Sequence, residues 1–208
     1  MSVPVTIVNN AVVITGYDPK RLIAALKLNV AVDLSAKTDW LADKYDRILG
    51  AIGRATRQLP DSVLAQDLSW RRQTIRSFIA HISGDAELAW LSRNRATASF
   101  EQMIAHFDGL RHLTTVDELF GYSESVRANI IQFLNSGDTD AFSRIVPAYK
   151  GGDVTILELL NFSLRHATHH LKQLYWLMDN SLSIAPENPA TREDMAGIFT
   201  PAKFEMES

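Results

Sequence analysis

The 208-residue sequence contains no cysteine. The chain therefore has no disulfide framework, no cysteine-ligated zinc site and no thiol nucleophile of its own. It has no apolar run long enough to cross a bilayer, and its N-terminus does not have the pattern of a signal peptide. The net charge of −3 is not the basic balance that nucleic-acid-binding proteins show. We therefore expect a cytoplasmic protein that binds neither nucleic acid nor membrane.

The composition is that of a folded globular protein. Hydrophobic residues make up 46% of the sequence and charged residues 22%, which argues against disorder. A chain of this length buries roughly 70% of the surface that its unfolded form exposes, so it can form a core without covalent cross-links.

The first 30 residues predict a small β-hairpin followed by a helix. Two β-prone runs, Val5–Val8 and Ala11–Thr15, flank Asn9-Asn10, and asparagine tolerates the backbone of a tight turn. Asp18 and Pro19 then provide a cap and a first helical position for a helix that continues through Leu26. An isolated hairpin is marginal in water, so residues 1–30 should form an appendage that packs on the main body or on another chain.

From Lys37 onward, apolar residues recur every three or four positions, the spacing of amphipathic helices. The pattern predicts four long helices, which span Lys37 to Pro60, residues 71–94, Thr115 to Gly137 and Thr155 to about Asn180. The last two begin with capping boxes, in which a threonine is followed three residues later by a glutamate. Because a four-helix bundle buries four apolar stripes together, we expect a mainly α fold with the bundle at residues 37–180.

The predicted links between these helices differ in length. The first link is short, whereas residues 95–114 and 137–153 form long links, the former with a short helix near Phe100–Phe107. Long second and third links are less consistent with a simple up-down-up-down order. Gly84 is a weak point in the second helix, costing about 1 kcal/mol relative to alanine. Residues 181–208, which contain three prolines, predict a wrapping tail with at most one short helix.

Half of the six histidines fall within five residues of the predicted fourth helix. His166 and His170 are four residues apart, so they lie on one helical face and can share a metal ion. His169 is rotated by about 100° from His170 and does not join the same site easily. A third ligand must then come from another helix. His81, on the edge of the apolar face of the second helix, is either such a ligand or a core histidine.

Two common metal chemistries do not fit this pattern. Ala167 stands where a zinc protease of the HExxH type has its catalytic glutamate. The Glu-x-x-His pairs of di-iron bundles are missing as well. His106 and His112 fall in connecting segments, where we expect them to be solvated. Glu158 faces the same side as His166 and His170, but its capping role explains it better.

Two segments resemble a known family. The segments Ser77–Ile82 and Arg165–Leu174, which contain these histidines, make residues 37–180 similar to the DinB/YfiT-like superfamily of metalloenzymes. The resemblance implies a four-helix bundle with long crossovers and a metal site formed by His81, His166 and His170. Gln173 stands where the family often has a glutamine after the last ligand.

A second resemblance concerns the N-terminal piece. Val3-Pro4-Val5 entering a hairpin, followed by Gly16-Tyr17-Asp18, makes residues 3–29 look like the closing half of a glutaredoxin. The redox half is absent, so redox activity does not carry over. The alternative is a hairpin and helix that only pad the bundle.

The functional hypothesis follows from an open metal position. Three neutral histidines leave a fourth position free on zinc, and imidazole also suits nickel and iron. DinB-like relatives that use mycothiol or bacillithiol imply a transferase with a low-molecular-weight thiol and a small-molecule substrate. The alternatives are a metal-dependent hydrolase, for which Asp85 is the nearest candidate base, and a non-enzymatic association module with a structural ion or none. Homodimerisation is common among relatives, and no catalytic residue can be assigned from the sequence.

Overall fold

The computed structural model describes residues 5–9, 12–15, 25–27, 35–96, 99–148 and 152–200. The chain divides into two compact units, Met1–Leu34 and Ser35–Ser208. Within the described residues, no helix is both long and apolar enough to cross a membrane.

The N-terminal unit contains the expected hairpin. Strand β1 (Val5–Val8) pairs antiparallel with β2 (Val12–Thr15), and Val8 lies opposite Val12. Asn9 has a φ of 52°, the left-handed backbone for which asparagine is suited. The helix predicted after Pro19 lies almost entirely outside the described residues.

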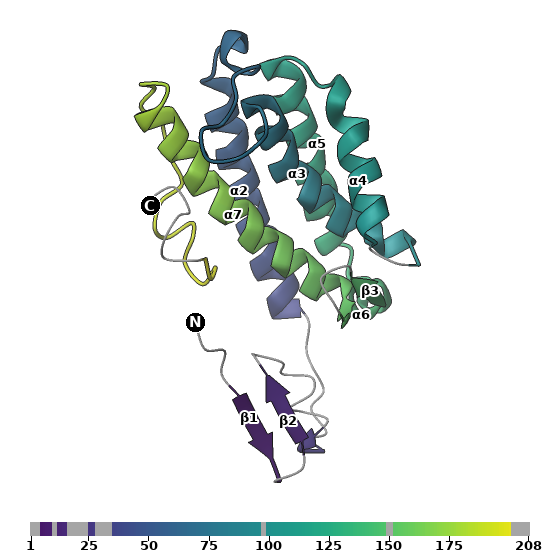
Figure 1. Ribbon diagram of the computed structural model, residues 1–208. Coiled ribbons are helices and arrows are strands. Elements are labelled where there is room, and N and C mark those ends of the chain that lie inside the picture. Colours follow the sequence, from purple (N-terminus) through teal and green to yellow (C-terminus); the bar gives the residue numbers. More distant parts are fainter. Residues whose placement is uncertain are drawn as a thin grey trace. The chain divides into compact units, whose positions relative to one another are not determined.

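Four long helices form the second unit (Figure 1), and they confirm the predicted mainly α fold. They are α2 (Ser35–Arg57), α3 (Ile75–Leu91), α5 (Val116–Leu134) and α7 (Ile156–Asn180). Both predicted capping boxes are present: the side chains of Thr115 and Thr155 accept hydrogen bonds from the backbone N–H of Glu118 and Glu158. The side chain of Glu158 in turn accepts from the backbone N–H of Thr155 at 2.7 Å. Glu158 is therefore a capping residue, as predicted.

The helices pack as a ring in the order α2, α5, α3, α7. Helix α4 (Phe100–Gly109) runs back along α3, so α3 and α5 point in the same direction (Figure 1). The long second link therefore joins neighbouring parallel helices, which an up-down-up-down bundle does not have. Apolar side chains from all four helices fill the centre, and Tyr45 among them donates its hydroxyl to the carbonyl of Leu160 at 2.7 Å.

The prediction of a short first link was wrong. Helix α3 begins at Ile75 rather than at residue 71, because Thr74 adopts an extended backbone and caps the helix through its side chain. Residues 58–74 form a loop that contains a short 3-10 turn, Asp61–Val63, and a β-bridge between Asp67 and Thr74. Helices α2 and α3 are not neighbours in the ring, so the segment that connects them must be long.

The last link also contains structure that the sequence did not predict. A short helix, α6 (Thr139–Ser143), is followed by a second antiparallel hairpin, β3 (Ile145–Ala148) with β4 (Gly152–Thr155). The hairpin leads directly into α7, because Thr155 is both the last strand residue and the N-cap of that helix. The missed signal was a pair of short β-prone runs on either side of Gly151-Gly152.

Gly84 is a contact point between helices. A Cβ atom at this position would lie 2.8 Å from side-chain carbons of both Phe107 and Leu110, closer than real contacts. The absence of a side chain thus lets α4 and the 3-10 turn Leu110–His112 approach α3. Glycine still lowers helix stability at this position. Its missing side chain, however, lets Phe107 and Leu110 lie close to α3, one turn after His81.

The segment that follows α7 packs along α2. The backbone N–H of Glu187 donates to the side chain of Gln58 at 2.7 Å, and Lys44 donates to the carbonyl of Glu193 at 3.0 Å. Arg47 forms an ion pair with Asp194 at 2.9 Å. Residues 181–200 contain turns but no helix, within the expected limit of one short helix.

Candidate metal centre

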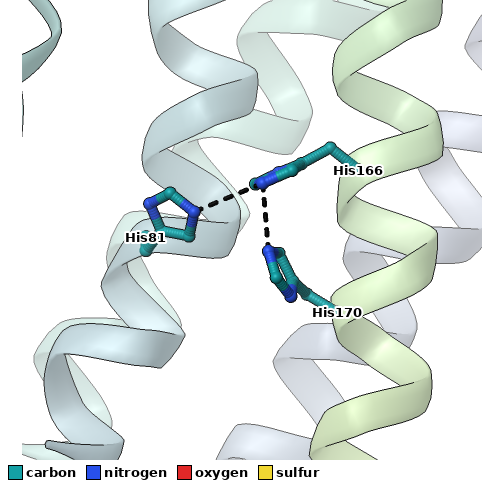
Figure 2. Close-up of side chains that lie close together, drawn as sticks. All are labelled: His81, His166 and His170. Carbon is teal, nitrogen blue, oxygen red and sulfur yellow. Dashed lines mark hydrogen bonds between the residues drawn. The ribbon is translucent and has the colours of Figure 1, made fainter. Parts of the chain in front are cut away.

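Three histidines meet between α3 and α7, as Figure 2 shows. His166 and His170 project from successive turns of α7, and His81 reaches them from the facing turn of α3. The His166 Nε2 atom lies 3.3 Å from that of His81 and 3.0 Å from that of His170. One nitrogen from each of the three side chains lies within 4.8 Å of the others. The structure thus brings together all three histidines that were predicted as metal ligands from the sequence.

Two of the three spacings between these nitrogens match the geometry of one small divalent ion. Zinc binds imidazole nitrogen at about 2.0–2.1 Å with tetrahedral geometry, which places neighbouring ligand atoms about 3.3 Å apart. The two nitrogen–nitrogen distances to His166, 3.3 and 3.0 Å, are close to this value. Nickel and iron also accept imidazole ligands, so the histidines alone do not select the metal.

Two of the three histidines, His81 and His170, are held in the neutral form that binds metal. Burial, together with the neighbouring His166 and His170, lowers the pKa of His81 to about 3. Burial and the proximity of His166 likewise lower the pKa of His170 to about 3, although its hydrogen bond to Gln173 acts in the opposite direction. Because both rings are neutral at pH 7, a lone pair is available on each without the loss of a proton.

Polar partners orient the two histidines of α7. The His170 Nδ1 atom lies 2.5 Å from Gln173 Oε1, an acceptor that places the ring proton on Nδ1. The His166 Nδ1 atom lies 3.4 Å from Asp85 Oδ2. In both rings an acceptor on the Nδ1 side favours the tautomer whose Nε2 lone pair faces the other histidines, as in many metal sites. Asp85, predicted as a possible base, thus stands beside a candidate ligand.

Aromatic side chains flank two of the three histidines. The rings of Phe78 and His170 meet edge to face, with 5.3 Å between their centroids, and the centroid of Phe107 lies 4.8 Å from that of His81. Phe78 is fully buried, and its ring also contacts Trp70 at 6.5 Å. Such walls lower the local dielectric, which strengthens electrostatic interactions within the site.

The remaining histidines lie outside the cluster. The His169 ring lies tilted beside His170, with 5.4 Å between centroids, but does not join the three-histidine group, as expected. His112 is exposed and hydrogen-bonds the carbonyl of Gly109, also as expected. The prediction for His106 was wrong: its side chain is only 9% exposed and lies 3.4 Å from Glu87. Helix α4 folds back onto α3 and buries this residue, which a connecting segment in extended form would leave in solvent.

The hydrogen bond from His170 to Gln173 gives a direct prediction. Replacing Gln173 with leucine removes the acceptor at a site where the side chain is 3% exposed, and we expect metal affinity to fall about 10- to 100-fold. Gln173→Glu retains an acceptor oxygen and should restore binding to within a few-fold of the unmodified protein. Competition with a chelating dye measures both affinities. Equal affinities for Gln173→Leu and the unmodified chain would contradict an orienting role for Gln173.

Comparisons with known proteins agree on the fold. A family model described as the DinB superfamily matches residues 41–174. A crystal structure of the mycothiol-dependent maleylpyruvate isomerase matches with a TM-score of 0.54 at 16% identity, covering 66% of this chain and 59% of that chain. A histidine-to-alanine mutant of that isomerase matches with a TM-score of 0.51 at 17% identity, over 62% of this chain and 59% of that one. The match thus spans about three fifths of either isomerase chain, and no curated protein matches this sequence.

Proposed function

Because the chain belongs to the DinB superfamily, a membership that the predicted resemblance anticipated, we propose that it is a metal-dependent enzyme. His81, His166 and His170 would hold the ion, and a low-molecular-weight thiol would be the cosubstrate in a transfer reaction. The observation that carries this proposal is the convergence of three imidazole nitrogens from two helices within 4.8 Å.

The protein's own residues prepare this site for an ion. A divalent ion held by three neutral imidazoles keeps a further position open and lowers the pKa of a thiol or water that binds there. Gln173 hydrogen-bonds the His170 ring, and Asp85 lies 3.4 Å from His166 Nδ1, so both histidines of α7 have a polar neighbour on the Nδ1 side. Phe78 packs against the His170 ring and Phe107 against one side of the His81 ring. We expect zinc or nickel, with iron as the further candidate.

One observation is compatible with an external thiol, and a second supports it. The chain has no cysteine, so any sulfur nucleophile must come from a cosubstrate. The two matching crystal structures are of an isomerase that is itself mycothiol-dependent. Hydrolysis is the alternative reaction, and it needs a general base near the ion. Asp85 is the candidate nearest in sequence, but its position 3.4 Å from His166 Nδ1 suits an orienting role better.

Because the chain contains no cysteine, thiol binding to the metal can be tested without a known substrate. The cobalt-substituted protein, titrated with N-acetylcysteine, should develop thiolate-to-cobalt charge-transfer absorption in the near ultraviolet. Because the chain contains no sulfur ligand of the cysteine type, such a band must arise from the added thiol. N-acetylserine, which replaces the thiol with a hydroxyl, should produce no band.

Each outcome of this titration has a definite meaning. Cobalt bound without a thiol-dependent band would contradict the thiol cosubstrate and favour the hydrolase. A protein that binds neither cobalt, zinc, nickel nor iron would contradict the metal enzyme and favour the association module. In that case the oligomeric state and the role of residues 1–30 should be measured next. We propose that the protein is a homodimer.

A further inference from the structure

A pocket of about 230 Å³ opens beside His81, on the side that faces α4. Its walls come from the beginning of α3 and from the segment that ends α4, and they include Gln73, Arg76, Ser77, Phe107 and Arg111. The pocket is smaller than those that hold drug-sized ligands, so it suits a small organic molecule. Because His81 is itself a wall, a molecule in the pocket would lie next to the candidate metal centre.

Positive charge prevails in this pocket. Arg76 donates to Ser77 Oγ at 2.7 Å and, over 3.3 Å, to the carbonyls of Leu110 and Leu113. Among the described residues it has no carboxylate partner within 4.0 Å. The second guanidinium, that of Arg111, forms an exposed ion pair with Asp108 at 2.7 Å. The pocket lining thus contains two guanidinium groups and one carboxylate, which gives it a net positive charge.

The pocket also contains hydrogen-bond donors that the protein does not use. The Gln73 Nε2 atom is buried and has no hydrogen-bond partner in the part of the chain that the structure describes. Ser77 Oγ accepts hydrogen bonds from Thr74 and Arg76, so its own proton is available to a further acceptor. An unpaired buried donor is costly, and a ligand oxygen would relieve that cost.

We propose that this pocket binds a small organic carboxylate, which is the molecule that reacts with the thiol. Arg76, Gln73 and Ser77 would hold the carboxylate oxygens through charge-assisted and neutral hydrogen bonds. Ser77 and His81 are one helical turn apart, about 6 Å along the axis, so the rest of the molecule would extend to the metal centre. The inference names a substrate class and rests on the function proposed above.

The test uses benzoate and its neutral analogue benzamide as probes for the full-length protein, by calorimetric titration with and without zinc. Benzoate should bind in both forms at least about tenfold more tightly than benzamide. Arg76→Gln should weaken benzoate roughly 10- to 100-fold, the usual effect of losing a hydrogen bond to a charged group, and leave benzamide unchanged. Arg72→Gln removes a charge from an exposed neighbour that does not line the pocket, and it should change benzoate binding less than about twofold.

Because Arg76 also donates hydrogen bonds to the carbonyls of Leu110 and Leu113, its replacement can weaken benzoate binding by disturbing the fold. A variant that gains affinity does not have this ambiguity. Asp108→Asn removes the one carboxylate of the pocket and should tighten benzoate about two- to fivefold. Equal binding of benzoate and benzamide, or benzoate binding only with zinc present, would overturn the proposal, and the second result would leave the metal enzyme intact. Benzoate binding by a chain that takes up no metal would instead contradict the proposed function and support the pocket.

Discussion

Replacing His166 with alanine should reduce metal affinity by at least roughly 100-fold. His166 lies between the other two histidines, with its Nε2 atom 3.3 Å from that of His81 and 3.0 Å from that of His170. Loss of an orienting partner alone costs about 10- to 100-fold in metal affinity, and loss of a ligand should cost more. Elemental analysis after dialysis, followed by competition with a chelating dye, measures the effect. The expected stoichiometry is near one ion per chain before the substitution and near none after it.

The matched control is His112→Ala. His112 is exposed and lies outside the cluster, so its removal tests for nonspecific binding by surface histidines. We expect its metal affinity to equal that of the unmodified protein. If His166→Ala retains the helical circular dichroism signal and binds the ion as tightly as His112→Ala does, the three-histidine site is wrong.

Replacing Phe78 with alanine should lower the free energy of unfolding by about 3–5 kcal/mol. The Phe78 ring is fully buried between α3 and its neighbours, and it meets the rings of Trp70 and His170 in T-shaped arrangements. Its removal takes away the transfer free energy of the ring and leaves a cavity that a packed core fills only in part. Urea denaturation of the metal-free protein, monitored by circular dichroism, gives the difference.

The cavity should also weaken metal binding, because the His170 ring would lose one of its walls. Phe100→Ala is the control, since the Phe100 side chain on α4 is 53% exposed and its loss should cost less than about 0.5 kcal/mol. Phe78→Leu should fall between the two. A cost below about 1 kcal/mol for Phe78→Ala would show that the region beside His170 is not tightly packed.

The sequence predicted most closely what depends on local signals. The capping boxes at Thr115 and Thr155 correctly marked the starts of α5 and α7, because a side chain and a backbone N–H three residues away determine them. The pairing of His166 with His170 also follows from helical geometry alone. By contrast, apolar periodicity predicted that the second helix begins at residue 71. The structure begins it at Ile75, because Thr74 caps the helix and pairs with Asp67 in a β-bridge.

What the sequence did not predict depends on contacts between distant segments. The burial of His106 requires α4 to fold back on α3, which the close approach at Gly84 permits. The pocket beside His81 has walls from two segments, and nothing in the spacing of Arg76 and Arg111 marks them as neighbours. The role of Asp85 likewise depends on a helix about 80 residues further along the chain. Such features follow from tertiary packing, which local periodicity does not encode.

The contact between His81 and His166 joins positions 85 residues apart in the chain. Closing so long a segment costs conformational entropy, which grows with the logarithm of its length. In a zinc finger the ion itself offsets that cost, so the ion drives folding. Here the buried faces of α3 and α7 hold the segment closed. An ion at the proposed site would therefore meet ligands at a spacing set by the packed helices, and its bond lengths would have to match that spacing. Metal preference would then depend on core packing, and we expect distant substitutions that shift α7 along α3 to change it.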